Sequence, residues 1–160
     1  PFKLFLGAYM PEWQRYQTPI GLDRPPDFGC ISSGLCIHCF ENEIRDYIRE
    51  TLSENEGIDW WSKLPQKIRT HAESRQETAL KDSWLEGEKS DLLGFIDFGM
   101  LSSIMIEKWQ FFSNIIPSQH WLKQRMEELE KARHFIAHNR MLLPSEFQRI
   151  YMYIADWNRV

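Results

Sequence analysis

Residues 126–142 read Met-Glu-Glu-Leu-Glu-Lys-Ala-Arg-His-Phe-Ile-Ala-His-Asn-Arg-Met-Leu, and no other part of the chain places so many polar groups on an apolar stripe. Arg133 lies in the middle of that stripe. Because a guanidinium does not lose its charge, at a core-facing position it must bind a carboxylate, a backbone carbonyl or a phosphate. The stretch therefore predicts a helix with a functional cation on its inner face, whose apolar members are Leu122, Met126, Leu129, Ile136 and Ala137.

Histidines accompany this arginine. His138 follows Arg133 after four residues, and His134 precedes His138 by one helical turn. The ordinary pKa of histidine lies close to neutral pH, which suits it to proton transfer, and an arginine can bind two phosphate oxygens at once. We interpret Arg133 and His138 as the candidate catalytic residues, with three supporting residues beside them: His134, Asn139 and Arg140.

The spacing of Arg133 and His138 resembles the Arg-x4–6-His signature of HEPN (higher eukaryotes and prokaryotes nucleotide-binding) domains. The polar His134 after the arginine, the acidic lead-in at 127–130 and the segments at 96–101 and 109–112 are also similar to that family. The resemblance covers about residues 32–157. It implies a helical fold, metal-independent cleavage of RNA by Arg133 and His138, no cofactor, and a homodimer whose motifs face each other across a cleft.

The composition of the chain limits its possible classes. A chain of 160 residues predicts one domain, and its net charge of −4 is unlike the basic field of most nucleic-acid-binding proteins. RNA contact must then be local, through a cluster such as Arg133 with Arg140. Three cysteines, no signal peptide and no apolar run of ~18 residues favour a cytoplasmic protein without a membrane span. The start at Pro1 rather than Met is compatible with a processed piece or one part of something larger.

The first 31 residues differ from the rest. Closely spaced prolines forbid a long helix there, while aromatic and aliphatic residues between them are too apolar for a free tail. We expect residues 1–31 to form an arm packed on the domain or on a partner. Residues 32–160 predict the helical domain.

Helical periodicity and capping signals divide that domain. The first helix is expected from an N-cap at Ser32 or Ser33 to the Asn-Glu-Gly at 55–57. Its inner face holds Cys36, Phe40, Ile44, Tyr47, Ile48 and Leu52. A polar helix follows from Pro65 to about Leu85, with Ile68, Ala72 and Ala79 inward.

Three more helices complete the prediction. One begins after a capping Asp97 and continues to Ile116, and the motif helix begins after Ser118 as N-cap. The last helix begins with Ser145 and Gln148 as a capping box. Its inner face holds Phe147, Ile150, Tyr151 and Ile154. No strand-type alternation occurs, so the fold class is all-α, an up-and-down bundle of four or five helices.

Two further motifs have simpler explanations. Cys36-Ile-His-Cys39 supplies too few ligands for a structural zinc site, which takes four, so small thiols on a helix face are the default. Asp97-Phe98-Gly99 resembles the metal-binding triplet of protein kinases, but no glycine-rich loop or His-Arg-Asp loop accompanies it.

Geometry constrains the candidate pair. Five residues rotate an ideal helix through about 140°, so Arg133 and His138 do not face each other on one helix. Either the helix loosens near Ile136, or one site is assembled from two chains. The predicted function is a dimeric metal-independent endoribonuclease in defence or toxin-like RNA cleavage. His138 acts as acid or base, Arg133 binds phosphate, and His134 and Asn139 orient them.

Other interpretations remain open. Arg133 could form a buried ion pair with Glu43, Asp46 or Glu130, with His138 only capping the helix. The chain would then be a non-catalytic dimerisation or interaction module of a larger assembly. A nucleotide-binding sensor is a third possibility. In Arg-x4-His-x-Tyr toxins, a partner antitoxin modifies the tyrosine, and Arg140 occupies that position here, which argues against such control.

Overall fold

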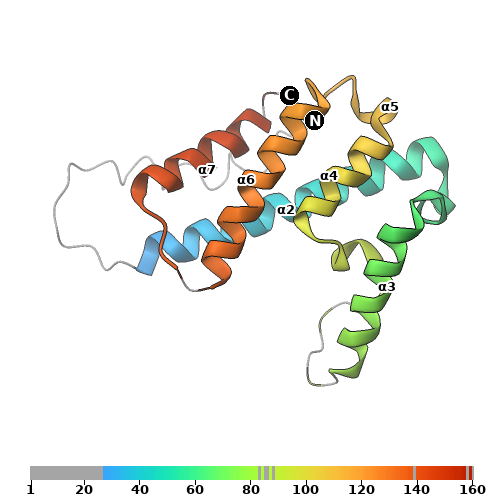
Figure 1. Cartoon of the computed structure of the whole chain (residues 1–160), viewed down its shortest axis with the longest axis horizontal. Helices are drawn as coiled ribbons and strands as arrows, with labels where there is room; N and C mark the ends of the chain where they lie inside the picture. The colour runs from blue at the N-terminus through green and yellow to red at the C-terminus, as the bar shows by residue number, and fades with distance from the viewer. Residues whose placement is uncertain are drawn as a thin grey trace.

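The computed structural model describes residues 27–82, 84, 87, 89–138, 140–157 and 159, with the side chains of 27–33 and 35 left out, so the expected N-terminal arm lies outside the described residues. Within that part every regular element is helical, which confirms the predicted all-α fold (Figure 1). None of the described helices is long and apolar enough to cross a membrane. In order, the elements are α2 Asp27–Glu56, η1 Ile58–Lys63, α3 Gln66–Lys81, η2 Leu92–Phe95, α4 Phe98–Glu107, α5 Trp109–Phe112, α6 Gln119–Ala137 and α7 Pro144–Trp157.

Helix α2 is the longest helix, and α6, α4 and α7 pack around it, while α3 extends away from them (Figure 1). Its buried face follows the predicted spacing through Phe40, Ile44, Ile48 and Leu52, with Ile37 added at the near end. Cys36 and Tyr47 only flank this face. The predicted start at Ser32 or Ser33 is wrong, because the helix extends back to Asp27, directly after Pro26, and no proline interrupts it.

Aromatic side chains join three helices at the centre of the core. Trp157 of α7 lies edge-on to Phe40 of α2, with ring centroids 5.6 Å apart, and 5.2 Å from Trp121 of α6. Phe40 also contacts Phe98 at the start of α4. These rings explain why so aromatic a chain forms a tight helical core.

The predicted helix from Asp97 to Ile116 is two helices. The backbone of Lys108 leaves helical geometry, with φ −103° and ψ 30°, and separates α4 from α5. Its ammonium lies 2.8 Å from a carboxylate oxygen of Glu56 in α2. This mostly buried ion pair is a tertiary contact, and sequence periodicity carries no signal for it.

Asp97 precedes α4 as predicted, but its side chain does not cap the helix. Its carboxylate instead binds His71 at 3.1 Å and also Arg75, both on α3. The capping carboxylate is instead that of Glu130 in α6, which accepts a hydrogen bond from the backbone N–H of Gly99 at 3.2 Å. The first turn of α4 is therefore capped from another helix.

The remaining helix ends differ in detail from expectation. Helix α6 begins as predicted, because the Ser118 hydroxyl accepts from the N–H of Trp121. Helix α3 ends at Lys81 rather than near Leu85, although Ile68 and Ala72 are buried as expected. For α7 the predicted capping box is wrong.

Pro144 occupies the first position of α7, and the Glu146 carboxylate accepts from the N–H of Leu143 at 2.7 Å. Tyr153 and Trp157 join Ile150 and Ile154 on its buried face, whereas Tyr151 is only half-buried. The hydrophobic stripe of α7 is therefore displaced by part of a turn from the predicted one.

Candidate functional site

Arg133 lies near the end of α6, beyond the buried residues Leu122, Met126 and Leu129 of the same face. At this level α6 is close to the start of α2, and the helix face becomes half-exposed. The Arg133 side chain is 41% exposed to solvent. The predicted position on the apolar face is correct, but the guanidinium reaches the boundary between core and solvent.

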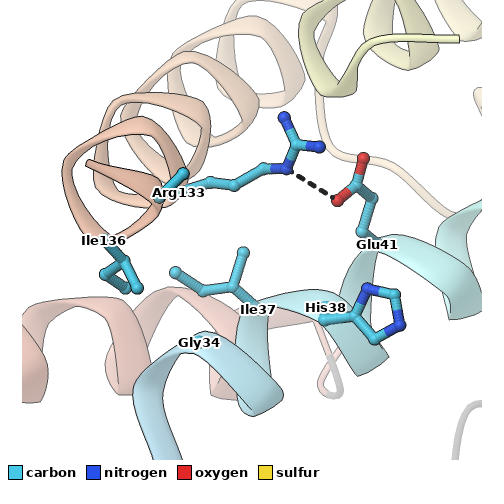
Figure 2. Close-up of a pocket in the computed structure, with 7 residues that line it drawn as sticks. Gly34, Ile37, His38, Glu41, Arg133 and Ile136 are labelled. Atoms are coloured by element: carbon cyan, nitrogen blue, oxygen red, sulfur yellow. Dashed lines mark ion pairs between the residues drawn. The ribbon is translucent and has the colours of Figure 1, made fainter. Parts of the chain in front are cut away.

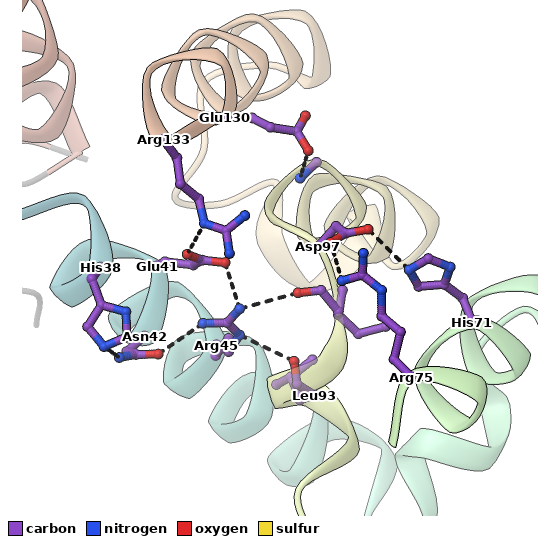
Figure 3. A network of polar contacts seen from close by, with 12 residues as sticks. His38, Glu41, Asn42, Arg45, His71, Arg75, Leu93, Asp97, Glu130 and Arg133 are labelled. Carbon is purple, nitrogen blue, oxygen red and sulfur yellow. Dashed lines mark hydrogen bonds and ion pairs between the residues drawn. The ribbon is translucent and has the colours of Figure 1, made fainter. Parts of the chain in front are cut away.

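A buried carboxylate holds this arginine. Glu41 of α2 is only 2% exposed, and its Oε2 atom lies 3.1 Å from Nε of Arg133. Its other oxygen, Oε1, accepts from Nη2 of Arg45 at 2.6 Å. Two guanidinium groups thus share one carboxylate, and the three side chains carry a net charge of +1 (Figure 3). A chain with net charge −4 therefore keeps a local positive site.

Arg45 anchors this group to the fold. Its Nε donates to the carbonyl of Leu93 and its Nη2 to the carbonyl of Ile96, both at 3.2 Å. Nη1 donates to Asn42 Oδ1 at 2.9 Å. Every guanidinium nitrogen of Arg45 thus donates to a protein group, whereas among the described residues Arg133 has a charged partner only at Nε. The terminal Nη1 and Nη2 groups of Arg133 are the donors available to a ligand.

The ion-pair partners expected for Arg133 were wrong. Glu130 binds Gly99, Asp46 binds Arg49, and no ion pair joins Glu43 to Arg133 among the described residues. Glu41 had a detectable signal, because it stands among the inward positions of α2, four residues before Arg45. An acidic residue on an apolar helix face needs a cation in the same way as Arg133 needs an anion.

A pocket of about 180 Å³ lies beside the ion pair, between α2 and α6 (Figure 2). Its polar lining consists of Arg133, Glu41 and His38, and His38 is a residue that the sequence reasoning missed. The rest of the wall is small or aliphatic: Gly34, Ile37, Ile136 and Ala137. The pocket can therefore hold a small anionic group with an apolar portion.

His138 is not part of that pocket. Helix α6 stays helical through Ala137, so the expected loosening near Ile136 does not occur, and His138 takes the C-cap position. Its backbone N–H donates to the carbonyl of His134, and both imidazoles are exposed. One chain therefore does not bring Arg133 and His138 into one pocket, as the helical rotation predicted.

The other two supporting residues also lie away from the Arg133 pocket or outside the structure. The guanidinium of Arg140 lies 5.4 Å from the ring centroid of Phe135, and its backbone N–H donates to the carbonyl of Phe135 beyond the end of α6. It does not line the pocket with Arg133, so the expected Arg133–Arg140 cluster is not formed within one chain. Asn139 lies outside the described residues.

Cys36 and Cys39 of α2 form no disulfide. Burial, together with the smaller effects of the charges of Cys39 and Glu43, raises the pKa of the Cys36 thiol to about 11. At neutral pH this thiol is therefore protonated and a poor nucleophile. No group of three or more His, Cys, Asp or Glu side chains in the described part of the chain is placed to hold a metal ion.

A family model described as Swt1-like HEPN matches residues 36–160. No significant match was found among curated proteins or among solved structures. The matched range contains all of α6 and α7 and the part of α2 that supplies His38, Glu41 and Arg45.

Proposed function

Because the chain belongs to the family of Swt1-like HEPN domains, we propose that it is an endoribonuclease that cleaves RNA without a metal ion, with Arg133 and His138 as catalytic residues. The observation that carries this proposal is that Arg133 has terminal nitrogens available to bind a phosphate. Glu41 holds the guanidinium through Nε, and the two terminal nitrogens remain available at a half-exposed position. The setting, toxin-like attack on RNA in defence, rests on the family resemblance alone.

In the proposed reaction the ribose 2′-oxygen attacks the adjacent phosphate. The 2′-oxygen loses its proton and forms a new bond to phosphorus, while the bond from phosphorus to the 5′-oxygen breaks and that oxygen gains a proton. Arg133 stabilises the negative charge that builds up on the phosphate oxygens through two parallel N–H groups. His138 either accepts the proton of the 2′-hydroxyl or donates a proton to the 5′-oxygen, and solvent water carries the other proton. With Arg133 stabilising the charge on the phosphate, these steps require no metal.

Since His138 lies outside the Arg133 pocket of its own chain, we propose that the site is composite, with the two motifs of a homodimer facing each other. Apolar side chains next to the motif favour an interface there, because Met141 and Leu143 are 57% and 62% exposed. His134, Asn139 and Arg140 adjoin His138 in sequence, and we propose that they orient RNA across the same cleft.

Metal removal provides the direct test. The purified chain is expected to cleave end-labelled RNA equally well with and without EDTA, because its proton transfer and charge stabilisation come from side chains. Gel analysis of the products measures this, and a ribonuclease that requires Mg²⁺ serves as a control for chelation. Loss of cleavage in EDTA would contradict the proposed mechanism.

Subunit mixing tests the composite site. Arg133→Ala and His138→Ala are each expected to be inactive, but an equilibrated mixture should recover about a quarter of wild-type activity. A wild-type dimer contains two pairs, each of Arg133 from one chain and His138 from the other. Half of the dimers in such a mixture are hetero-dimers, and in each of these one of the two pairs is intact. Two Arg133→Ala preparations mixed together form the control. No recovery, with subunit exchange confirmed by a fluorescent label, would argue against a site shared between chains.

The ion pair itself favours a second candidate function. Arg133 has the acidic partner that a purely structural arginine needs, although through Nε alone. A non-catalytic dimerisation module of a larger assembly would use it in this way. Such a module predicts no RNA turnover by the wild-type chain in any buffer, and an unchanged dimer in Arg133→Ala by analytical ultracentrifugation.

A further inference from the structure

His38 is the histidine that shares a pocket with Arg133, although it lies on α2, far from the motif in sequence (Figure 2). A chain of polar contacts joins the two residues. From Arg133 it passes to Glu41 at 3.1 Å, to Arg45 at 2.6 Å, to Asn42 at 2.9 Å and to His38 at 3.2 Å (Figure 3). Each of these contacts limits the orientation of the next side chain.

This chain determines which imidazole nitrogen carries the proton. A guanidinium only donates hydrogen bonds, so the atom of Asn42 that accepts from Arg45 is its amide oxygen. The NH₂ group of Asn42 therefore faces His38 and donates to Nε2. An Nε2 atom that accepts a hydrogen bond leaves the proton of the neutral ring on Nδ1. His38 thus presents a fixed N–H donor rather than a free lone pair.

We propose that His38 is a substrate-contacting residue, and that its Nδ1–H donates a hydrogen bond to a phosphate oxygen of the nucleotide bound by Arg133. This inference rests on the proposed function and adds a second anchor to the same site. A volume of about 180 Å³ is smaller than the ~300–1,000 Å³ of pockets that enclose a whole small ligand. The pocket therefore takes one group of the RNA, and Arg133 and His38 contact that one group.

The surroundings of His38 suit a phosphate. Glu41 would repel an anion if it were free, but both of its oxygens are occupied by guanidinium groups. The positive excess of the Arg133, Glu41 and Arg45 group lies at the pocket wall. The aliphatic side chains of Ile37 and Ile136 also line the pocket, and a hydrogen bond to a charged oxygen is stronger beside apolar groups than in bulk water. His38 itself remains exposed and accessible.

Three variants separate this role from that of an ordinary surface histidine. His38→Ala removes the donor, His38→Asn places an amide N–H close to the position of Nδ1, and His120→Ala removes an exposed histidine at the start of α6. Titration calorimetry with adenosine 3′-monophosphate measures binding without turnover, and RNA cleavage measures KM and kcat. We expect His38→Ala to weaken nucleotide binding and raise KM about tenfold, with most of the loss recovered in His38→Asn.

The outcomes distinguish this inference from the proposed function. If the wild-type chain cleaves RNA and His38→Ala behaves like His120→Ala in both assays, the role of His38 is overturned while the nuclease proposal stands. Suppose instead that the wild-type chain binds the nucleotide but does not cleave RNA, that His38→Ala binds it more weakly, and that His38→Asn binds it nearly as well as wild type. The nuclease proposal then fails and the nucleotide contact stands. Equal binding by all three variants and wild type overturns the contact. Melting temperatures of the variants equal to that of wild type show that a loss of binding or cleavage does not come from unfolding.

Discussion

Replacing Arg133 with alanine is expected to lower the rate of RNA cleavage by at least about a hundredfold, the range found when one donor to a developing oxyanion is removed. The guanidinium is the only positively charged group that lines the pocket in the described part of the chain, and its two terminal nitrogens can bind a phosphate. The helical circular dichroism signal should not change, because Arg133 is 41% exposed and contributes little to the core.

Two further variants make this result specific. Arg133→Lys keeps the charge but not the planar pair of donors, and it cannot hold Glu41 through Nε while binding phosphate with the terminal nitrogens, so we expect little recovery. Lys131→Ala removes an exposed charge from the same helix and should cleave at the wild-type rate. RNA turnover by Arg133→Ala above about a tenth of the wild-type rate would contradict a catalytic role for the arginine.

The sequence is most informative about α6. A serine N-cap, an apolar stripe and an interrupting arginine are local features, and Ser118, Leu122, Met126 and Leu129 occupy their predicted places. The angular separation of Arg133 and His138 also follows from helical geometry alone. Local rules therefore predict both the helix and the fact that Arg133 and His138 of one chain point in different directions.

Contacts between helices account for most of the differences. The helix predicted from Asp97 to Ile116 is interrupted at Lys108, whose ammonium pairs with Glu56 of α2. Asp97 does not cap α4, because Glu130 of α6 accepts the hydrogen bond from the N–H of Gly99 instead. The inward position of Glu41 on α2 is a local signal that its carboxylate needs a cation, but nothing local indicates that Arg133 is one of the cations that it meets. Which side chain of α6 meets Glu41 depends on where α6 crosses α2.

Replacing Glu41 with alanine should have the largest effect on stability, a loss of about 3–5 kcal/mol in the free energy of unfolding, because removing one partner leaves a buried charge without compensation. Arg45 is 11% exposed, and its remaining contacts are neutral groups. A loss of this size is a large share of the ~5–15 kcal/mol that stabilises a typical domain. Urea denaturation of Glu41→Ala measures it.

The matched variants identify the source of that loss. Glu50→Ala removes an exposed carboxylate from the same helix and should stay within about 0.5 kcal/mol of wild type. The double variant Glu41→Leu with Arg45→Met removes both buried charges and should recover much of the stability, since a buried pair replaced by apolar groups is often nearly neutral. It should not recover RNA cleavage, because Arg133 then lacks the carboxylate that orients it. If Glu41→Ala matched Glu50→Ala in stability, Glu41 could not be the anchor that holds both arginines.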